Sequence, residues 1–428
     1  MQSAANATTA PTKTGVFGQI TSLISIQRIG LSKAWLFVAS LLFASYVLRM
    51  TAIPWPLPRD ATNYVGIMVA FAMVMLAGKP RIVSLYVFAL LATLPSVLVS
   101  PNVEDSGLRW IGWALLIVAV GPPLAGQTVF RFRFFLLMIF LAFIHLASIG
   151  SGILGAIGIQ APGGRGSFWG LLSHSNILGT VSSLAAIDSF SKWSSRDTKL
   201  SKNLWLLILL IELSTSVRAA SRAALLGSFV CGVAIAYCRD SKSKSQMFVM
   251  LLVLTITGVG YQLVRESEHY SRAENGSLVA TLASKGLTNT REKLWDDRLR
   301  EFESKPAFGI GFCMGAKDGM RIRDDGFMQE PGSSYLAALS MSGVVGAIGF
   351  LILISPLIQA SIRLTQNRYG SEPPFFAISS LFWLIAMLTE GFSHYVGSPL
   401  CFALFLWSGV AADAQTQFPN QDPLKARL

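Results

Sequence analysis

LVRESEHYSRAENGSLVATLASKGLTNTREKLWDDRLREFESKPAFGIGFCMGAKDGMRIRDDGFMQEPGS, residues 263–333, is the longest polar stretch in a chain that otherwise consists of apolar runs. It holds 11 Lys/Arg and 12 Asp/Glu, so more than half of the 23 acidic residues lie in one sixth of the length. We interpret it as a folded loop on one face of a membrane bundle, and we expect it to carry part of an active site.

The composition outside this stretch is typical of a membrane protein. Apolar residues make up 52% of the 428 residues and charged residues 14%, with a mean hydropathy of +0.53. Soluble domains carry about 25% charged residues. The apolar residues come in blocks long enough to cross a hydrocarbon core about 30 Å thick. The alternating segments of about ten residues that build membrane β-barrels are absent. The sequence therefore predicts an all-α polytopic membrane protein.

About twelve transmembrane helices are expected from the apolar runs, which are 33–50, 62–78, 82–100, 109–125, 133–150, 171–190, 203–217, 222–238, 246–263, 334–360, 375–391 and 398–412. The run 334–360 is long enough to tilt or to begin outside the bilayer. We divide the chain into an N-terminal tail (1–32), a transmembrane domain (33–412) that contains a periplasmic loop (264–333), and a C-terminal tail (413–428).

Basic residues favour one orientation of this bundle. With the N-terminus inside, every short inner connection is basic, including the connection that contains Arg131 and Arg133. This pattern is typical of cytoplasmic loops and places both termini in the cytoplasm. The 264–333 loop then lies outside, because long loops cross the membrane regardless of their charge. The net charge of +12 is explained in the same way, without a nucleic-acid partner.

Two arginines follow an apolar run in Ser-Val-Arg-Ala-Ala-Ser-Arg-Ala-Ala-Leu-Leu-Gly, residues 216–227. Arg218 and Arg222 are four residues apart and would share a face if helical. Their planar guanidinium groups suit phosphate oxygens, and contact with lipid headgroups is the alternative. Glu212 lies inside the preceding span, where a carboxylate needs a partner. We expect Arg218 or Arg222 to be that partner.

A glycine-rich turn, Gly163-Gly164-Arg165-Gly166, is followed by a span that begins near His174 and Asn176. The glycines would allow the backbone to approach a ligand closely, and Arg165 adds a charge. An ordinary external turn is the alternative. Glu390 and His394 end a later span on the same predicted face and could line the same cavity. The four cysteines match no metal-site spacing, so no metal is expected.

A helix is predicted within the polar loop. Thr290 is a candidate N-cap, and Pro306 should end the helix. One apolar stripe is expected at spacings of four and three residues, formed by Trp295, Leu299 and Phe302. The stripe predicts that the loop packs on the bundle. Arg291 near the helix start could contact an anion, and a solvated charge is the alternative.

The order of these motifs resembles the bacterial O-antigen ligase and O-antigen/exopolysaccharide polymerase superfamily. The first motif is the Gly-rich turn with His174. The others are Ser-Arg-Ala-Ala-Leu-Leu-Gly at 221–227, Asn-Thr-Arg-x-x-Leu-Trp at 289–295 and Pro-x-x-Gly-x-Gly-Phe at 306–312. The resemblance covers about 160–410, and it includes Ser334-Tyr335-Leu336 at the end of the loop.

This resemblance implies a membrane glycosyltransferase with a type C fold in the bacterial inner membrane. It implies that a glycan on undecaprenyl pyrophosphate is transferred at the periplasmic face to a sugar hydroxyl of an acceptor glycan, without a cofactor or metal. Arginines would hold the pyrophosphate. Arg222 and Arg291 match the family's arginines by position, and Arg165 and Arg218 are looser matches. Such arginines fit the chemistry, because fixed cations stabilise an anionic leaving group.

The sequence departs from the ligases at one position. Ligases carry a His just before the end of the loop, where this chain has Gly332 or a close neighbour. We therefore predict Glu330 as the catalytic base, since a carboxylate that reaches the acceptor hydroxyl can do this work. His394 is the second choice.

The missing His favours a polymerase of lipid-linked repeat units in exopolysaccharide, capsule or O-antigen synthesis. An O-antigen ligase that transfers glycan to lipid A-core is the close alternative. A transporter of lipid-linked glycan and a non-catalytic assembly subunit are the other classes. Expected partners are the lipid-linked glycan, the acceptor glycan, the bilayer and other polysaccharide export proteins.

Overall fold

The computed structural model describes residues 80–158, 170–195, 198–219, 221–237, 289–313, 332–365, 375–394 and 398–417, with Phe168 and several residues between 40 and 51. Most of these residues are helical. Within these ranges, three helices are long and apolar enough to cross a membrane: α7 (Gln127–Ala156), α9 (Lys199–Arg218) and α14 (Ser334–Leu353). The helical membrane fold is therefore confirmed in outline. The number of twelve spans and the outer position of the loop stay predictions.

The other elements in the described ranges are β1 (Arg81–Ile82), α4 (Ser84–Leu91), α5 (Pro95–Leu98), α6 (Val103–Val120), β2 (Leu124–Ala125), α8 (Ser175–Ser195), α10 (Arg222–Tyr237), α13 (Asn289–Ser304), α15 (Ser355–Thr365), α16 (Phe375–Thr389) and α17 (Pro399–Gln417). The two strands pair antiparallel, which is a small departure from the all-α prediction. The predicted runs 62–78 and 246–263 lie outside the described residues.

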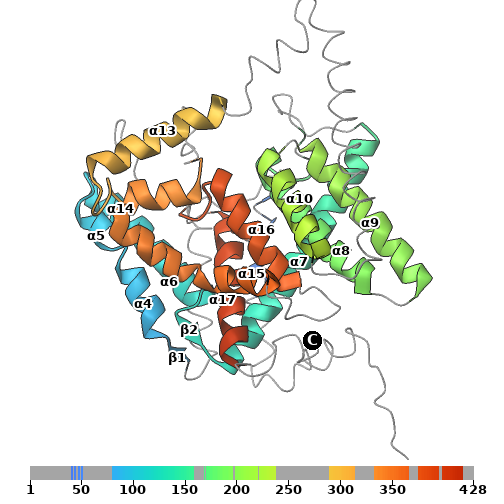
Figure 1. Cartoon of the computed structure of the whole chain (residues 1–428), viewed down its shortest axis with the longest axis horizontal. Helices are drawn as coiled ribbons and strands as arrows, with labels where there is room; N and C mark the ends of the chain where they lie inside the picture. The colour runs from blue at the N-terminus through green and yellow to red at the C-terminus, as the bar shows by residue number, and fades with distance from the viewer. Residues whose placement is uncertain are drawn as a thin grey trace, which may run out of the picture.

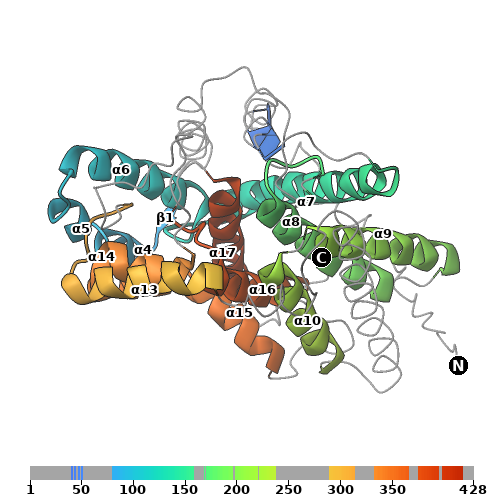
Figure 2. The ribbon, with the colours of Figure 1, turned by 90° about the horizontal axis from the view of Figure 1, so that it is seen from above.

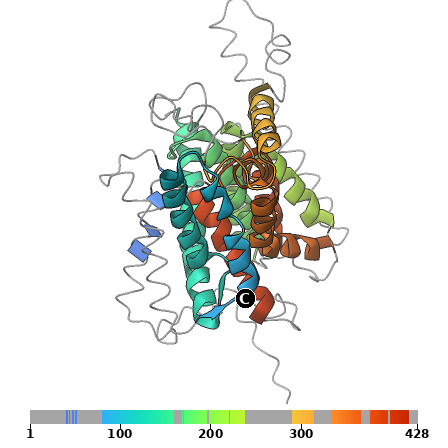
Figure 3. The ribbon, with the colours of Figure 1, turned by 90° about the vertical axis from the view of Figure 1, so that its left-hand side faces the viewer.

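Two groups of helices flank a central one. Helices α4, α5, α6 and α14 lie on one side and α7 to α10 on the other, with α15, α16 and α17 between them (Figures 1 and 2). Helix α13 lies at one end of the molecule, and β1 lies at the opposite end (Figures 1 and 3). We call these the α13 end and the β1 end.

Helix α17 forms the centre of the core because it is apolar on nearly all sides. Its residues from Leu400 to Ala412 are all buried. The Trp407 ring packs against Phe140 of α7 and Trp383 of α16, with ring centroids 6.5 and 6.1 Å apart. A helix that is apolar all round is stable only when other elements cover it. Helices from both flanking groups therefore pack around α17.

The predicted run 82–100 is not one helix, which corrects the sequence-based interpretation. The chain turns after α4, and Pro95 begins α5. Proline lacks an N–H and clashes with the preceding turn, so it is accepted only at the start of a helix. The Thr93 hydroxyl stabilises the turn, because it donates to the Leu90 carbonyl and accepts from Trp110 Nε1, both at 2.7 Å.

The predicted run 334–360 is also interrupted. Gly343 has φ 62° and ψ −169°, which breaks α14 in its middle. The segment that follows α13 enters this break. The Ile310 amide donates to the Ser340 carbonyl at 2.9 Å, and the Val344 amide donates to the Pro306 carbonyl at 2.8 Å. Backbone groups freed in an apolar bundle must find partners inside the protein. The Pro-x-x-Gly-x-Gly-Phe motif supplies them.

Two glycines allow this close approach. A β-carbon on Gly343 would collide with the Ala307 carbonyl, and one on Gly309 would collide with the Met341 carbonyl. Both glycines also have positive φ, 62° and 74°. The two backbones therefore contact each other directly, as only glycine permits.

Arg133 is not in a loop, as the charge pattern predicted, but inside α7. Its side chain is fully buried and its Nη1 lies 2.7 Å from Asp413 Oδ2 of α17. It also donates to the carbonyls of Leu124 and Gly121. A buried guanidinium needs a carboxylate and further acceptors to offset its lost hydration. The pair ties the start of α7 to the end of α17.

Breaking this pair should destabilise the bundle. Asp413→Ala leaves Arg133 buried without its carboxylate, and we expect a loss of about 3–5 kcal/mol of folding free energy. Thermal unfolding of the purified protein in detergent measures the effect as a lower Tm. The double variant Arg133→Met with Asp413→Leu is the control and should recover most of the loss. A single variant as stable as the wild type would contradict the prediction.

Candidate active site

Three segments that are distant in the sequence meet where α8 and α14 begin and α16 ends. Asn176 Nδ2 donates to Glu390 Oε2 at 3.4 Å, and the Ser334 hydroxyl donates to the Glu390 carbonyl at 2.7 Å. The Ser393 amide donates to the Ser334 hydroxyl at 3.4 Å. Glu390 is only 6% exposed. The Glu390 carboxylate is therefore buried and lies beside the Asn176 amide, while its backbone carbonyl accepts from Ser334.

His394 follows this carboxylate in the chain and lies in an aromatic enclosure. It is 1% exposed, and its ring stacks on Trp113 with centroids 5.6 Å apart, while Phe312 and Phe350 also contact it. Nδ1 is 2.8 Å from the Ser393 hydroxyl, and Nε2 has no hydrogen-bond partner among the described residues. Burial lowers the pKa of His394 to about 3, so the imidazole is neutral. Its predicted catalytic role stays a prediction.

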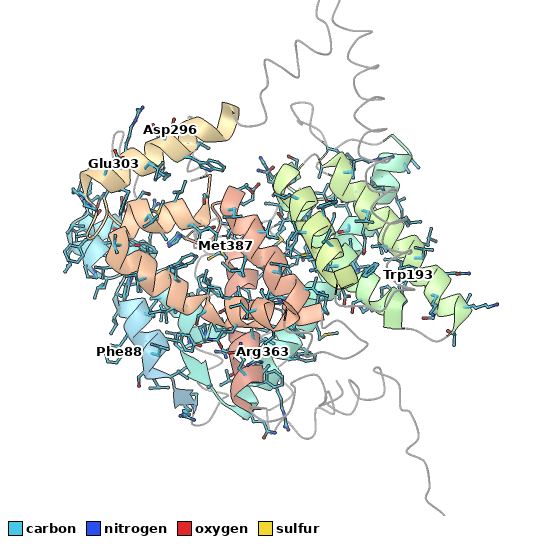
Figure 4. The ribbon with its side chains drawn as sticks, in the orientation of Figure 1. Phe88, Trp193, Asp296, Glu303, Arg363 and Met387 are labelled. Carbon is cyan, nitrogen blue, oxygen red and sulfur yellow. The ribbon has the colours of Figure 1, made fainter. Side chains whose placement is uncertain are left out.

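Helix α13 covers this end of the bundle. It runs beside α14, with Asp296 near its middle and Glu303 near its end, and Met387 marks the end of α16 below it in the view (Figure 4). Trp295 Nε1 donates to the Gly332 carbonyl at 3.2 Å, which ties the helix to the residues before α14. The predicted helix is therefore present and packs on the bundle. It begins at Asn289, so Thr290 lies inside it and is not its N-cap.

The packed face of α13 differs from the predicted stripe. Leu299 is 43% exposed, whereas Arg298 and Glu301 are buried. Arg298 Nη1 lies 2.6 Å from Glu301 Oε2, so the two charges compensate each other three residues apart. Trp295 and Phe302 are half-buried on either side of them. The Arg298–Glu301 ion pair, and not Leu299, therefore lies on the packed face of α13.

Arg218 and Arg222 belong to two helices and not to one helical face, which corrects the prediction. Arg218 is the last residue of α9 and Arg222 the first of α10. The half-buried Arg218 side chain lies against Gly155 of α7, where a β-carbon would meet its Nη1 and the Phe168 ring. The start of a helix carries a partial positive charge, so Arg222 adds a second positive charge at the start of α10. A bound anion there would offset both charges. The Arg222 side chain is not among the described parts of the structure.

The other predicted site residues are only partly described. Arg165 and Glu330 lie outside the described residues. Arg291 lies in the first turn of α13, and its side chain is not described. His174 is exposed, and its Nδ1 accepts from the Asn176 amide at 3.1 Å. No cluster of His, Cys, Asp or Glu in the described part of the chain could hold a metal ion.

Glu212 has a partner that the sequence did not suggest. Its carboxylate lies 2.6 Å from His145 Nδ1 of α7. Among the described side chains it makes no contact with Arg218, which was one of the two predicted partners, and the Arg222 side chain lies outside the described residues. His145 is 67 residues away in the chain, and no local pattern points to it. Asn176 and Glu390 were expected to line one cavity, but the hydrogen bond between them was not predicted. Their shared position at the end of spans was the only signal.

Comparison with known protein families bears on this arrangement. Residues 204–351 match the family model of the O-antigen ligases. The match confirms the resemblance predicted from the sequence. It runs from α9 through α13 to α14 and includes Arg218, Arg222 and Arg291, and it indicates glycan transfer of the O-antigen ligase or polymerase type. No curated protein matches the chain.

Proposed function

We propose that the protein is a membrane glycosyltransferase that joins undecaprenyl-pyrophosphate-linked repeat units into a bacterial polysaccharide. The observation that carries the proposal is the O-antigen ligase match over 204–351. This stretch contains α13, which packs beside α14 and is tied by Trp295 to Gly332, two residues before Ser334. We place the protein in the inner membrane with both termini cytoplasmic and the α13 end facing the periplasm.

The arginines would hold the leaving group. Arg218 ends α9, Arg222 begins α10, and Arg291 lies in the first turn of α13. In the reaction, an acceptor hydroxyl attacks the anomeric carbon of the sugar, and the bond from that carbon to the pyrophosphate oxygen breaks. Negative charge grows on the pyrophosphate, and fixed cations stabilise it. Arg165 would add a further contact to the same group.

A base must take the proton of the acceptor hydroxyl. Glu330 remains our first proposal from the sequence, and His394 the second. The structure leads us to place Glu390 ahead of both, because its carboxylate lies beside Asn176 at the same end of the bundle. A general base must come within hydrogen-bonding reach of the proton that it removes.

Gly332 supports the choice of polymerase over ligase. Its φ is 79°, and a β-carbon there would lie 3.1 Å from Leu294 of α13. A histidine at this position would be strained and would press against the helix. This tight position of Gly332 supports our choice of a polymerase, in which the ligase histidine is not required. Transfer to lipid A-core remains the alternative, because the matching family is described as O-antigen ligase.

Loss of an arginine should separate the candidate functions. We expect Arg222→Ala to stop polymer formation while the protein still inserts, because the leaving group loses its cation. Lipid-linked glycans from cells that carry the variant are analysed by mass spectrometry, beside cells that lack the protein. Single repeats on the periplasmic face support the polymerase.

The control is Arg300→Ala, since Arg300 is exposed on α13. It should leave chain lengths unchanged. Long unligated chains in the Arg222→Ala cells would instead identify a ligase, and repeats held on the cytoplasmic face would identify a transporter. Polymer of normal length would remove Arg222 from the mechanism and would favour an assembly subunit.

A further inference from the structure

Four ionisable side chains form a continuous chain inside helices α7, α8 and α9. Lys192 Nζ lies 2.5 Å from Asp188 Oδ2, which lies 2.7 Å from His145 Nε2. His145 Nδ1 then lies 2.6 Å from Glu212 Oε1. The exposed fraction is 30% for Lys192, 7% for Asp188, 14% for His145 and 0% for Glu212. The chain therefore leads from a partly exposed cation to a fully buried carboxylate.

The imidazole bridges two carboxylates from opposite sides of its ring. The charged groups that face it are Asp188 and Lys192 of α8 and Glu212 of α9, and the Trp205 ring of α9 meets its edge. Lys192 also lies over Trp205, 4.5 Å from the ring centroid. An imidazole can accept a proton on one nitrogen and release the other proton from its second nitrogen. A bridging ring is therefore placed to pass protons between the two carboxylates.

A purely structural role would also explain a buried set of alternating acidic and basic groups. It does not explain the buried hydroxyls that lie on or next to the same helices. Ser189 donates to Glu212 Oε2 at 2.7 Å. Three buried hydroxyls, those of Ser148, Ser182 and Ser221, have no hydrogen-bond partner among the described residues. Such groups are commonly satisfied by ordered water, which also carries protons.

We propose that His145, Asp188, Lys192 and Glu212 form a proton-exchange path between the end of the bundle where Lys192 lies and the buried Glu212. At high pH His145 is neutral and carries its one proton on Nδ1, toward Glu212. As the pH falls, water near Lys192 delivers a proton from the solvent to Asp188, and Asp188 gives it to the unprotonated His145 Nε2. His145 releases its other proton from Nδ1 to Glu212, which becomes a neutral acid. The protein gains one proton and one positive charge. This activity is separate from glycosyl transfer and does not depend on it.

Infrared spectroscopy after a rapid pH jump tests the path with the full-length protein in lipid bilayers. We expect a carboxylic-acid carbonyl band to appear as the pH falls from about 9 to about 5, across the range in which histidine relays operate. Glu212→Gln should remove this band, which assigns it. His145→Gln keeps polar contacts but cannot relay protons, so the band should appear about 100-fold more slowly.

Lys192→Met is a second variant. Lys192 lies at the partly exposed end of the path, so we expect this substitution to affect folding less than a change at the buried groups. It should also slow the appearance of the carboxylic-acid carbonyl band. Arg300→Ala is the control and should match the wild type. Absence of a band that depends on Glu212, or an unchanged rate in both His145→Gln and Lys192→Met, would overturn the proposal. Glycan transfer, measured in the same variants, should be unchanged, so a failure of the proton path is distinguished from a failure of the proposed function.

Discussion

Glu390→Gln should reduce glycan transfer by about 100-fold or more, the contribution expected of a positioned general base. The substitution keeps the size of the side chain and an oxygen that can accept from Asn176 Nδ2. It also leaves the Ser334 contact intact, because Ser334 donates to the backbone carbonyl of residue 390. Folding should therefore change little, while the ability to accept a proton is lost. Purified lipid-linked repeats and electrophoresis of the product measure the rate.

Two further variants make this test specific. Glu303→Gln, on the exposed side of α13, is a matched carboxylate control and should keep the wild-type rate. Glu330→Gln tests the first choice from the sequence. A 100-fold loss in Glu330→Gln, of the size a general base contributes, with normal transfer in Glu390→Gln would assign the base to the loop. Normal transfer in both variants would leave His394 as the candidate, to be replaced by Gln in turn.

Local patterns predicted the helices well, because a span or an amphipathic helix is determined by the residues within it. The α13 helix and its end before Pro306 follow from such patterns. The spans of α7 and α9 follow from their apolar length. What failed involved partners elsewhere in the fold. Leu299 is exposed because Arg298 and Glu301 can pair with each other, which a hydrophobic pattern cannot register.

The same limit applies to the candidate site. Arginines next to spans were found because a charge in that position is unusual. The contact between Asn176 and Glu390 joins residues 214 positions apart, and His145 of α7 reaches Glu212 of α9. Glu212, Asn176 and Glu390 stand out in their own segments, but nothing in those segments points to their partners. Only the packing of α7, α8, α9 and α16 brings them together.

The break in α14 leads to the second large prediction. Gly343→Ala should lower the free energy of unfolding by at least about 4 kcal/mol, among the largest effects of single substitutions. The new β-carbon would collide with the Ala307 carbonyl, and φ of 62° with ψ of −169° is a region that essentially only glycine occupies. The collision would separate α14 from the segment after α13. Thermal unfolding in detergent measures the loss.

Gly158→Ala separates backbone strain from collision. Gly158 also has a positive φ, 78°, but a β-carbon there would meet nothing within 4 Å. We expect a loss of only about 1–2 kcal/mol, the cost of the left-handed conformation alone. If the two variants lose equal stability, strain explains both effects and the contact between the two backbones adds nothing. If Gly343→Ala loses more, and glycan transfer falls with it, the break is what holds α13 over the site.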